Sequence, residues 1–178
     1  MILYVLVLAA WLPIALGWTG RAVRVSAVLA TALLGAAAVA RATTDVDVDA
    51  GLLGLFAAVL ALAGGSVVTT AVFHTIDEQA GDADPSMEAA GQILRGGTWI
   101  GVLERLAVFG SLVVGMPSGV ALALAVKGLG RYPELRSGTR PATAERFIIG
   151  TLVSVLWAAL CAYVVTGLTP TSFDASAF

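Results

Sequence analysis

Apolar residues in this chain come in long runs that are separated by short polar segments. The runs lie at 2–18, 25–42 and 50–73, then over about 30 residues at 98–127, and finally at 141–167. A run of about 20 apolar residues is long enough to cross the hydrocarbon core of a bilayer as a helix. The pattern therefore predicts an all-α protein, built as a polytopic membrane helix bundle.

The run at 98–127 is too long to be a single span. At about 1.5 Å per residue it would extend roughly 45 Å as one helix, whereas the hydrocarbon core is about 30 Å thick. The segment Gly115-Met-Pro117-Ser-Gly119 supplies a break, because proline cannot continue an inner helix and glycine permits a turn. We therefore expect about six transmembrane helices, the fourth at 98–115 and the fifth at 117–131. The fifth is short, so it either tilts and thins the bilayer locally or is re-entrant.

The distribution of basic residues sets the expected topology. None precedes the first run, whereas Arg21 and Arg24 follow it, which is the reverse of a signal peptide and typical of a spanning helix with its N-terminus outside. With six spans, every Lys and Arg except Arg41 falls on or near the cytoplasmic side. We expect both termini outside a bacterial cytoplasmic membrane.

The whole apolar part is expected to form one unit. Residues 1–168 are interpreted as a single integral membrane domain, in which 74–97 is a cytoplasmic connector. Residues 169–178 are expected to form a flexible tail. The connector is too short to be a domain of its own.

Composition agrees with this class and excludes several others. The chain is 58% hydrophobic and 12% charged, and its mean hydropathy of +0.92 is outside the range of soluble domains. Its single cysteine, Cys161, excludes an intrachain disulfide and is expected to be a buried hydrophobic residue. The basic residues form no patch with interleaved aromatics, so nucleic acid is not an expected partner.

No motif for enzymatic activity is present, and no cofactor is expected. There is neither a nucleophile elbow nor a phosphate-binding loop, and Gly64-Gly65 is better explained as a packing or kink site within a helix. His74, Asp77 and Glu78 share one helix face and are a weak candidate for a divalent metal site. A polar helix end leaving a membrane has the same spacing, so no metal is assigned.

Charged residues embedded in the C-terminal apolar runs are the strongest candidates for function, because ionisable groups are costly within a membrane. They are Glu104, Arg105, Lys127, Arg131, Glu145 and Arg146. Helical spacing places Glu104, Lys127 and Arg146 each on a stripe of small residues in one of three helices, and such stripes are where membrane helices approach closely. These stripes are Gly97, Gly101, Glu104, Val108, Ser111 and Gly115, then Gly119, Ala123, Lys127 and Arg131, and then Arg146, Gly150, Ser154 and Ala158. We expect the three charges to face protein at a similar cytoplasmic depth.

The simplest arrangement of these charges is an ion-pair network. In it Glu104 pairs with Lys127, Arg146 or both, and Glu145 contacts Arg105 or Arg131, which offsets much of the desolvation of each ion. Such a network could fix helix register and topology alone. Alternatively, Glu104 handles protons or cations, or the basic residues hold an anionic lipid headgroup.

Three segments carry a resemblance to a known family. They are Gly97-Thr-Trp-Ile-Gly-Val-Leu-Glu-Arg105, Ala125-Val-Lys-Gly-Leu-Gly-Arg131 and Ala144-Glu-Arg-Phe-Ile-Ile-Gly-Thr-Leu-Val-Ser154. At these residues the chain resembles the C-terminal membrane part of a bacterial family known only as a domain of unknown function. Here Lys127 is followed by Gly rather than Ser, and Arg146-Phe147 stands in place of Tyr. The resemblance covers about 60 residues and implies no activity. Among the charges above it picks out Glu104, Arg105, Lys127 and Glu145.

The leading functional hypothesis is a small structural or accessory membrane subunit, in a homo-oligomer or with a partner subunit. The second is a channel or transporter for protons, cations or a small solute, with Glu104 on its path. The third is a lipid-acting enzyme with its chemistry at His74, Asp77 and Glu78.

Overall fold

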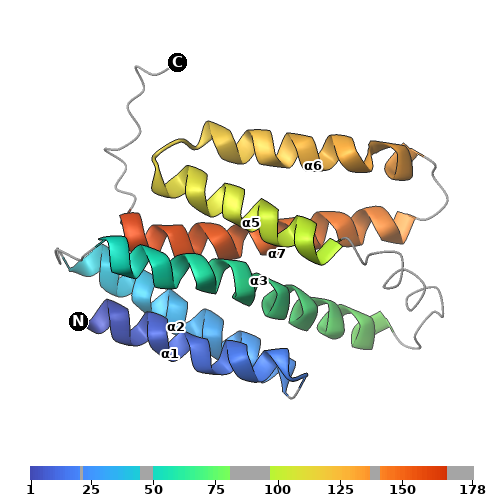
Figure 1. Ribbon diagram of the computed structural model, residues 1–178. Helices are drawn as coiled ribbons and strands as arrows, with labels where there is room; N and C mark the ends of the chain where they lie inside the picture. Colours follow the sequence, from blue (N-terminus) through green and yellow to red (C-terminus); the bar gives the residue numbers. More distant parts are fainter. Residues whose placement is uncertain (21, 45–49, 81–96, 137–140, 168–178) are drawn as a thin grey trace.

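The computed structural model describes residues 1–20, 22–44, 50–80, 97–136 and 141–167. This part of the chain is all-helical, and its helices lie side by side in a bundle (Figure 1). The helices are α1 Ile2–Trp18, α2 Val23–Thr43, α3 Ala50–Ala80, α5 Gly97–Val113, α6 Ser118–Arg136 and α7 Pro141–Thr166. The expected all-α architecture is confirmed, and the described residues form six helices, the number expected.

Three helical segments are long and apolar enough to cross a membrane, among the residues that the structure describes. They are Val23–Thr43, Gly51–Glu78 and Glu145–Thr166. Two other helical segments, Ile2–Trp18 and Ser118–Gly130, are apolar but shorter. A membrane location is therefore supported, and the finer expectation of six transmembrane spans stays a prediction.

Two helices extend beyond the expected bounds by five residues or more. α3 continues past residue 73 to Ala80, because the sequence has neither glycine nor proline between these positions. At 31 residues it is about 46 Å long, so it exceeds the hydrocarbon core and includes the first part of the connector expected at 74–97. α6 has 19 residues and ends at Arg136 rather than at 131. Residues 81–96 and the tail at 169–178 lie outside the described part.

Consecutive helices alternate in direction, so α1 begins at the end of the bundle where α7 ends (Figure 1). α3 is the central helix and packs on α1, α2, α5 and α7, whereas α6 lies at the periphery and packs mainly on α5. Buried side chains from α1, α2, α3 and α7, such as Leu34, Leu60 and Trp157, form the core together with Phe109 of α5. Many large apolar side chains remain exposed on the outer surface, as expected for a surface that faces lipid.

The break expected at Gly115–Gly119 is confirmed as a tight turn between α5 and α6. Gly115 adopts a φ of 73°, and the amide of Met116 donates to the carbonyl of Ser111 (2.8 Å), which closes the end of α5. A Cβ at Gly119 would lie 2.3 Å from Ser111 Oγ, so the two helices approach closely where α6 begins.

Candidate functional site

Arg105 on α5 is the most deeply buried charged side chain in the described part of the chain, with a relative exposure of 4%. Its Nε and Nη2 donate to the carbonyl of Leu62 on α3 at 3.0 and 2.7 Å. Nη2 also donates to Ser66 Oγ (3.0 Å), and Nη1 donates to Ser154 Oγ on α7 (3.4 Å). The guanidinium therefore joins three helices, and Arg105 rather than Glu104 occupies the centre of the bundle.

Glycines on α3 make room for this arrangement. A Cβ at Gly65 would lie 2.4 Å from Arg105 Cδ, and one at Gly64 would lie 2.5 Å from Cζ2 of Trp157 on α7. The indole Nε1 of Trp157 donates to the carbonyl of Leu60 (3.1 Å), so the ring lies against α3 beside Gly64. The prediction that Gly64-Gly65 is a packing site is confirmed.

The charges lie at two depths rather than one. Arg105 contacts residues 62–66, near the middle of α3, whereas Asp77 lies near its end. The 11 residues from Ser66 to Asp77 correspond to about 16 Å along the helix. A similar depth was predicted for Glu104, Lys127 and Arg146, and it does not extend to Arg105, because the short α5 lies against the middle of the much longer α3.

Glu104 on α5 forms an ion pair with Lys127 on α6, as one of the expected pairings proposed. Both side chains are largely buried, at 16% and 18% exposure, and Lys127 Nζ lies 5.5 Å from the centroid of the Phe147 ring on α7. The other carboxylate oxygen, Oε1 of Glu104, is buried and has no hydrogen-bond partner among the described residues. The carboxylate therefore retains capacity to accept a further proton or donor.

Arg146 pairs with Asp77 on α3 and not with Glu104, so that alternative is wrong. Its guanidinium also lies over the ring of Phe73, with 5.6 Å from Cζ to the ring centroid. A Cβ at Gly150 would lie 3.0 Å from Phe73 Cζ, so the small-residue stripe of α7 does face α3 as expected.

Glu145 does not contact Arg105. Its side chain is exposed at the start of α7, whereas the donors of Arg105 are directed to α3 and α7 in the interior. The sequence alone could not show this, because the rotation of α7 relative to α5 decides which of their side chains meet. The side chain of Arg131, the other expected partner of Glu145, lies outside the described part.

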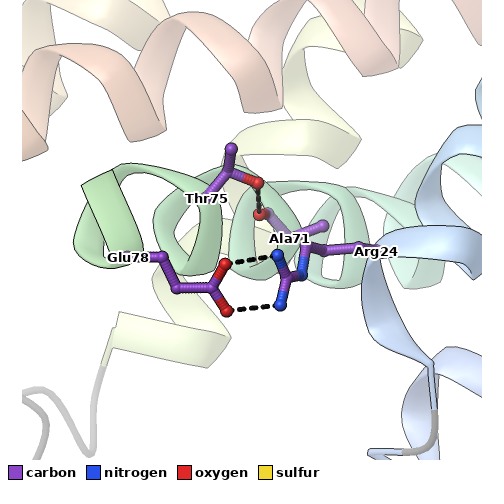
Figure 2. Close-up of polar contacts among 4 residues, drawn as sticks. All are labelled: Arg24, Ala71, Thr75 and Glu78. Carbon is purple, nitrogen blue, oxygen red and sulfur yellow. Dashed lines mark hydrogen bonds and ion pairs between the residues drawn. The ribbon is translucent and has the colours of Figure 1, made fainter.

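The structure does not assemble His74, Asp77 and Glu78 into a metal site. Asp77 pairs with an arginine of α7, and His74 is exposed. Glu78 forms a two-point pair with Arg24 of α2 (Figure 2). Within the described residues, no three His, Cys, Asp or Glu side chains are close enough to hold a metal ion.

Sequence reasoning missed the two pairs that join the end of α3 to its neighbours, Asp77–Arg146 and Arg24–Glu78. The sequence did contain a signal for these pairs, because the distribution of basic residues had already predicted Arg24 and Arg146 on the same side of the membrane as Asp77 and Glu78.

Comparison of the chain with protein-family models, with curated proteins and with solved structures gave no match. The resemblance to a family of unknown function therefore stays a prediction.

Proposed function

We propose that this chain is a non-enzymatic multi-pass protein that acts as a structural or accessory subunit of a homo-oligomer or larger membrane complex. The observation that carries the proposal is that its membrane-embedded charges connect helices. Glu104 and Lys127 link α5 to α6, Arg105 links α5 to α3 and α7, and Arg146 links α7 to α3. Buried ionic contacts of this kind are best attested as devices that specify one arrangement of helices.

The exposed surface of α6 supports assembly with another membrane helix. This peripheral helix exposes Leu122, Val126 and Leu129, and a Cβ at Gly128 or Gly130 would meet no atom within 4 Å. Glycines on an outer face allow a second helix to approach closely in a membrane. A second copy of this chain, or a partner subunit, would pack there.

For localisation we propose a bacterial cytoplasmic membrane, with the N-terminus outside. Arg24 lies in the first turn of α2 and Arg146 in the first two turns of α7, and consecutive helices alternate in direction. Both arginines therefore lie at the end of the bundle opposite to the start of α1, which suits the positive-inside rule. Anionic lipid headgroups would meet this basic end.

One observation favours the second candidate, a channel or transporter for protons, cations or a small solute. Oε1 of Glu104 is buried and without a hydrogen-bond partner in the described part of the chain. A buried carboxylate oxygen in this state is suited to bind a proton or a cation. Enzymatic action on lipid has no such support, because both carboxylates beside His74 already pair with arginines.

Purification from native membranes, followed by a flux assay in proteoliposomes, separates the two candidates. An accessory subunit should migrate as a larger complex, while Glu104→Gln weakens its stability and ion flux stays at background for both proteins. Flux that is present in the natural chain and lost in Glu104→Gln would refute the accessory role. Glu145→Gln is the matched control, because Glu145 is exposed at the start of α7.

A further inference from the structure

A groove of about 460 Å³ runs along the outer face of the bundle between α2 and α3. Alanine, valine and threonine side chains line it, and Arg24 lies at its mouth. From Arg24 to Ala32 the groove follows α2 for eight residues, which corresponds to about 12 Å of depth. In a membrane it would therefore extend from the headgroup level into the hydrocarbon core.

The walls of the groove are apolar in spite of the two threonines. Thr31 Oγ1 donates to the carbonyl of Ala27 (2.8 Å), and Thr75 Oγ1 donates to the carbonyl of Ala71 (3.0 Å; Figure 2). Since both hydroxyl hydrogens are used within their own helices, neither can donate to a bound molecule. The groove suits a hydrocarbon chain.

Arg24, which lines the groove at its mouth, is paired with Glu78, which is not itself one of the lining side chains. The guanidinium of Arg24 donates from Nη1 and Nη2 to the two carboxylate oxygens of Glu78, and the side chains are 52% and 57% exposed (Figure 2). A guanidinium has five N–H donors, so Nε and the outer hydrogens of Arg24 remain able to bind an anion. The carboxylate oxygens of Glu78 likewise retain lone pairs for a cationic donor.

We infer that this groove binds a phospholipid whose zwitterionic headgroup carries a primary ammonium. The acyl chain lies in the groove, the phosphate accepts from Arg24, and the ammonium donates to Glu78. A purely anionic headgroup would bring its phosphate near the Glu78 carboxylate with no second cation, beyond Arg24, to offset the repulsion. A quaternary ammonium carries no N–H and cannot donate to the carboxylate. The inference goes beyond the proposed subunit role and holds equally for a transporter.

Native mass spectrometry of the delipidated full-length protein tests the headgroup. The probes are dioleoyl phosphatidylethanolamine, phosphatidylcholine and phosphatidylglycerol, which share their acyl chains. We expect phosphatidylethanolamine to bind about tenfold more tightly than either of the others, as for one charge-assisted hydrogen bond. Glu78→Gln should bring the phosphatidylethanolamine to phosphatidylcholine ratio to about one and strengthen phosphatidylglycerol binding, because Arg24 loses its competing anion. Glu145→Gln, which changes an exposed carboxylate elsewhere, should leave all three affinities unchanged.

A second arm tests the groove itself. Ala32→Phe places a ring in the groove from an exposed position and should weaken all three lipids by about tenfold, as expected when most of a buried acyl segment is displaced. Ala36→Phe adds the same ring one turn away, outside the groove, and should have no effect. If Glu78→Gln fails to fold, Glu78→Asp, which withdraws the carboxylate by one methylene, should shift the preference in the same direction. The inference would be overturned if the three lipids bound equally or if phosphatidylglycerol bound most tightly. It would also be overturned if the preference survived both Glu78 variants, or if Ala32→Phe had no effect on binding.

Discussion

Replacing Gly65 by alanine is the most direct test of how the bundle accommodates its buried arginine. The new Cβ would lie 2.4 Å from Cδ and 2.8 Å from Nε of Arg105. Ordinary carbon contacts are about 3.5 Å, so Arg105 would have to retreat by about 1 Å. This retreat would lengthen the hydrogen bonds by which Arg105 holds α3 and α7.

The size of the destabilisation by Gly65→Ala follows from the number of hydrogen bonds that Arg105 donates. Arg105 donates four, two of them to Leu62 O, and hydrogen bonds between membrane helices average about 0.6 kcal/mol each. Losing all four would reduce the free energy of unfolding by about 2 kcal/mol. Alanine is the better helix former by about 1 kcal/mol, so the net destabilisation should be about 1 kcal/mol.

Gly54→Ala is the matched control on the same helix. Its Cβ would make only an ordinary contact, at 3.8 Å from Val165 Cγ1, so the substitution should stabilise by up to about 1 kcal/mol. The two variants should thus differ by about 2 kcal/mol and in opposite directions. Reversible unfolding in mixed micelles, with an increasing mole fraction of dodecyl sulfate, measures both.

Two outcomes would refute this reasoning. One is that Gly65→Ala stabilises the bundle as much as Gly54→Ala does. The other is that Gly65→Ala destabilises an Arg105→Ala background by as much as it destabilises the natural chain, because the clash requires the long Arg105 side chain.

Three further experiments test other contacts. Trp157→Ala should destabilise by about 3–5 kcal/mol in the same unfolding assay, as expected for a large buried ring. Trp157→Phe should lower the free energy of unfolding by only about 0.6 kcal/mol for the lost hydrogen bond to Leu60 O, apart from the effect of the change in ring size. An equal loss of stability in both variants would contradict the packing described. Lys127→Met should destabilise the protein more than the double variant Glu104→Gln/Lys127→Met does, because the single change leaves the Glu104 charge buried without its cation. The reverse order of stabilities would show that the pair does not determine stability. Cys161, with 0% exposure, should react with a maleimide only after denaturation. Rapid labelling of the folded protein would show that the packing of α7 described above is wrong.

Much of the fold could be predicted because the solvent of this chain, the bilayer, imposes strict requirements. Helix lengths, the break at Gly115–Gly119 and the small-residue faces follow from apolar run length, proline and periodicity. The end of α3 was predicted less well, since a polar segment carries no hydrophobic boundary and the helix continues to Ala80.

The candidate site was predicted only in part. Glu104–Lys127 was among the expected pairs, because both residues lie on small-residue faces of neighbouring helices. Arg105 was included in the network, but its partners are a backbone carbonyl and two serine hydroxyls, which no charge pattern can reveal.

By itself, the sequence determined the class of protein, the number and approximate bounds of its helices, and which faces are suited to close packing. Those properties depend on local composition and on helical period, and both can be read directly from the sequence. Only the tertiary structure decided which charges meet, how deeply Arg105 lies, and that α2 and α3 enclose a groove with Arg24 at its mouth. Those outcomes depend on the relative shift and rotation of helices far apart in sequence, and small changes in either would exchange one partner for another.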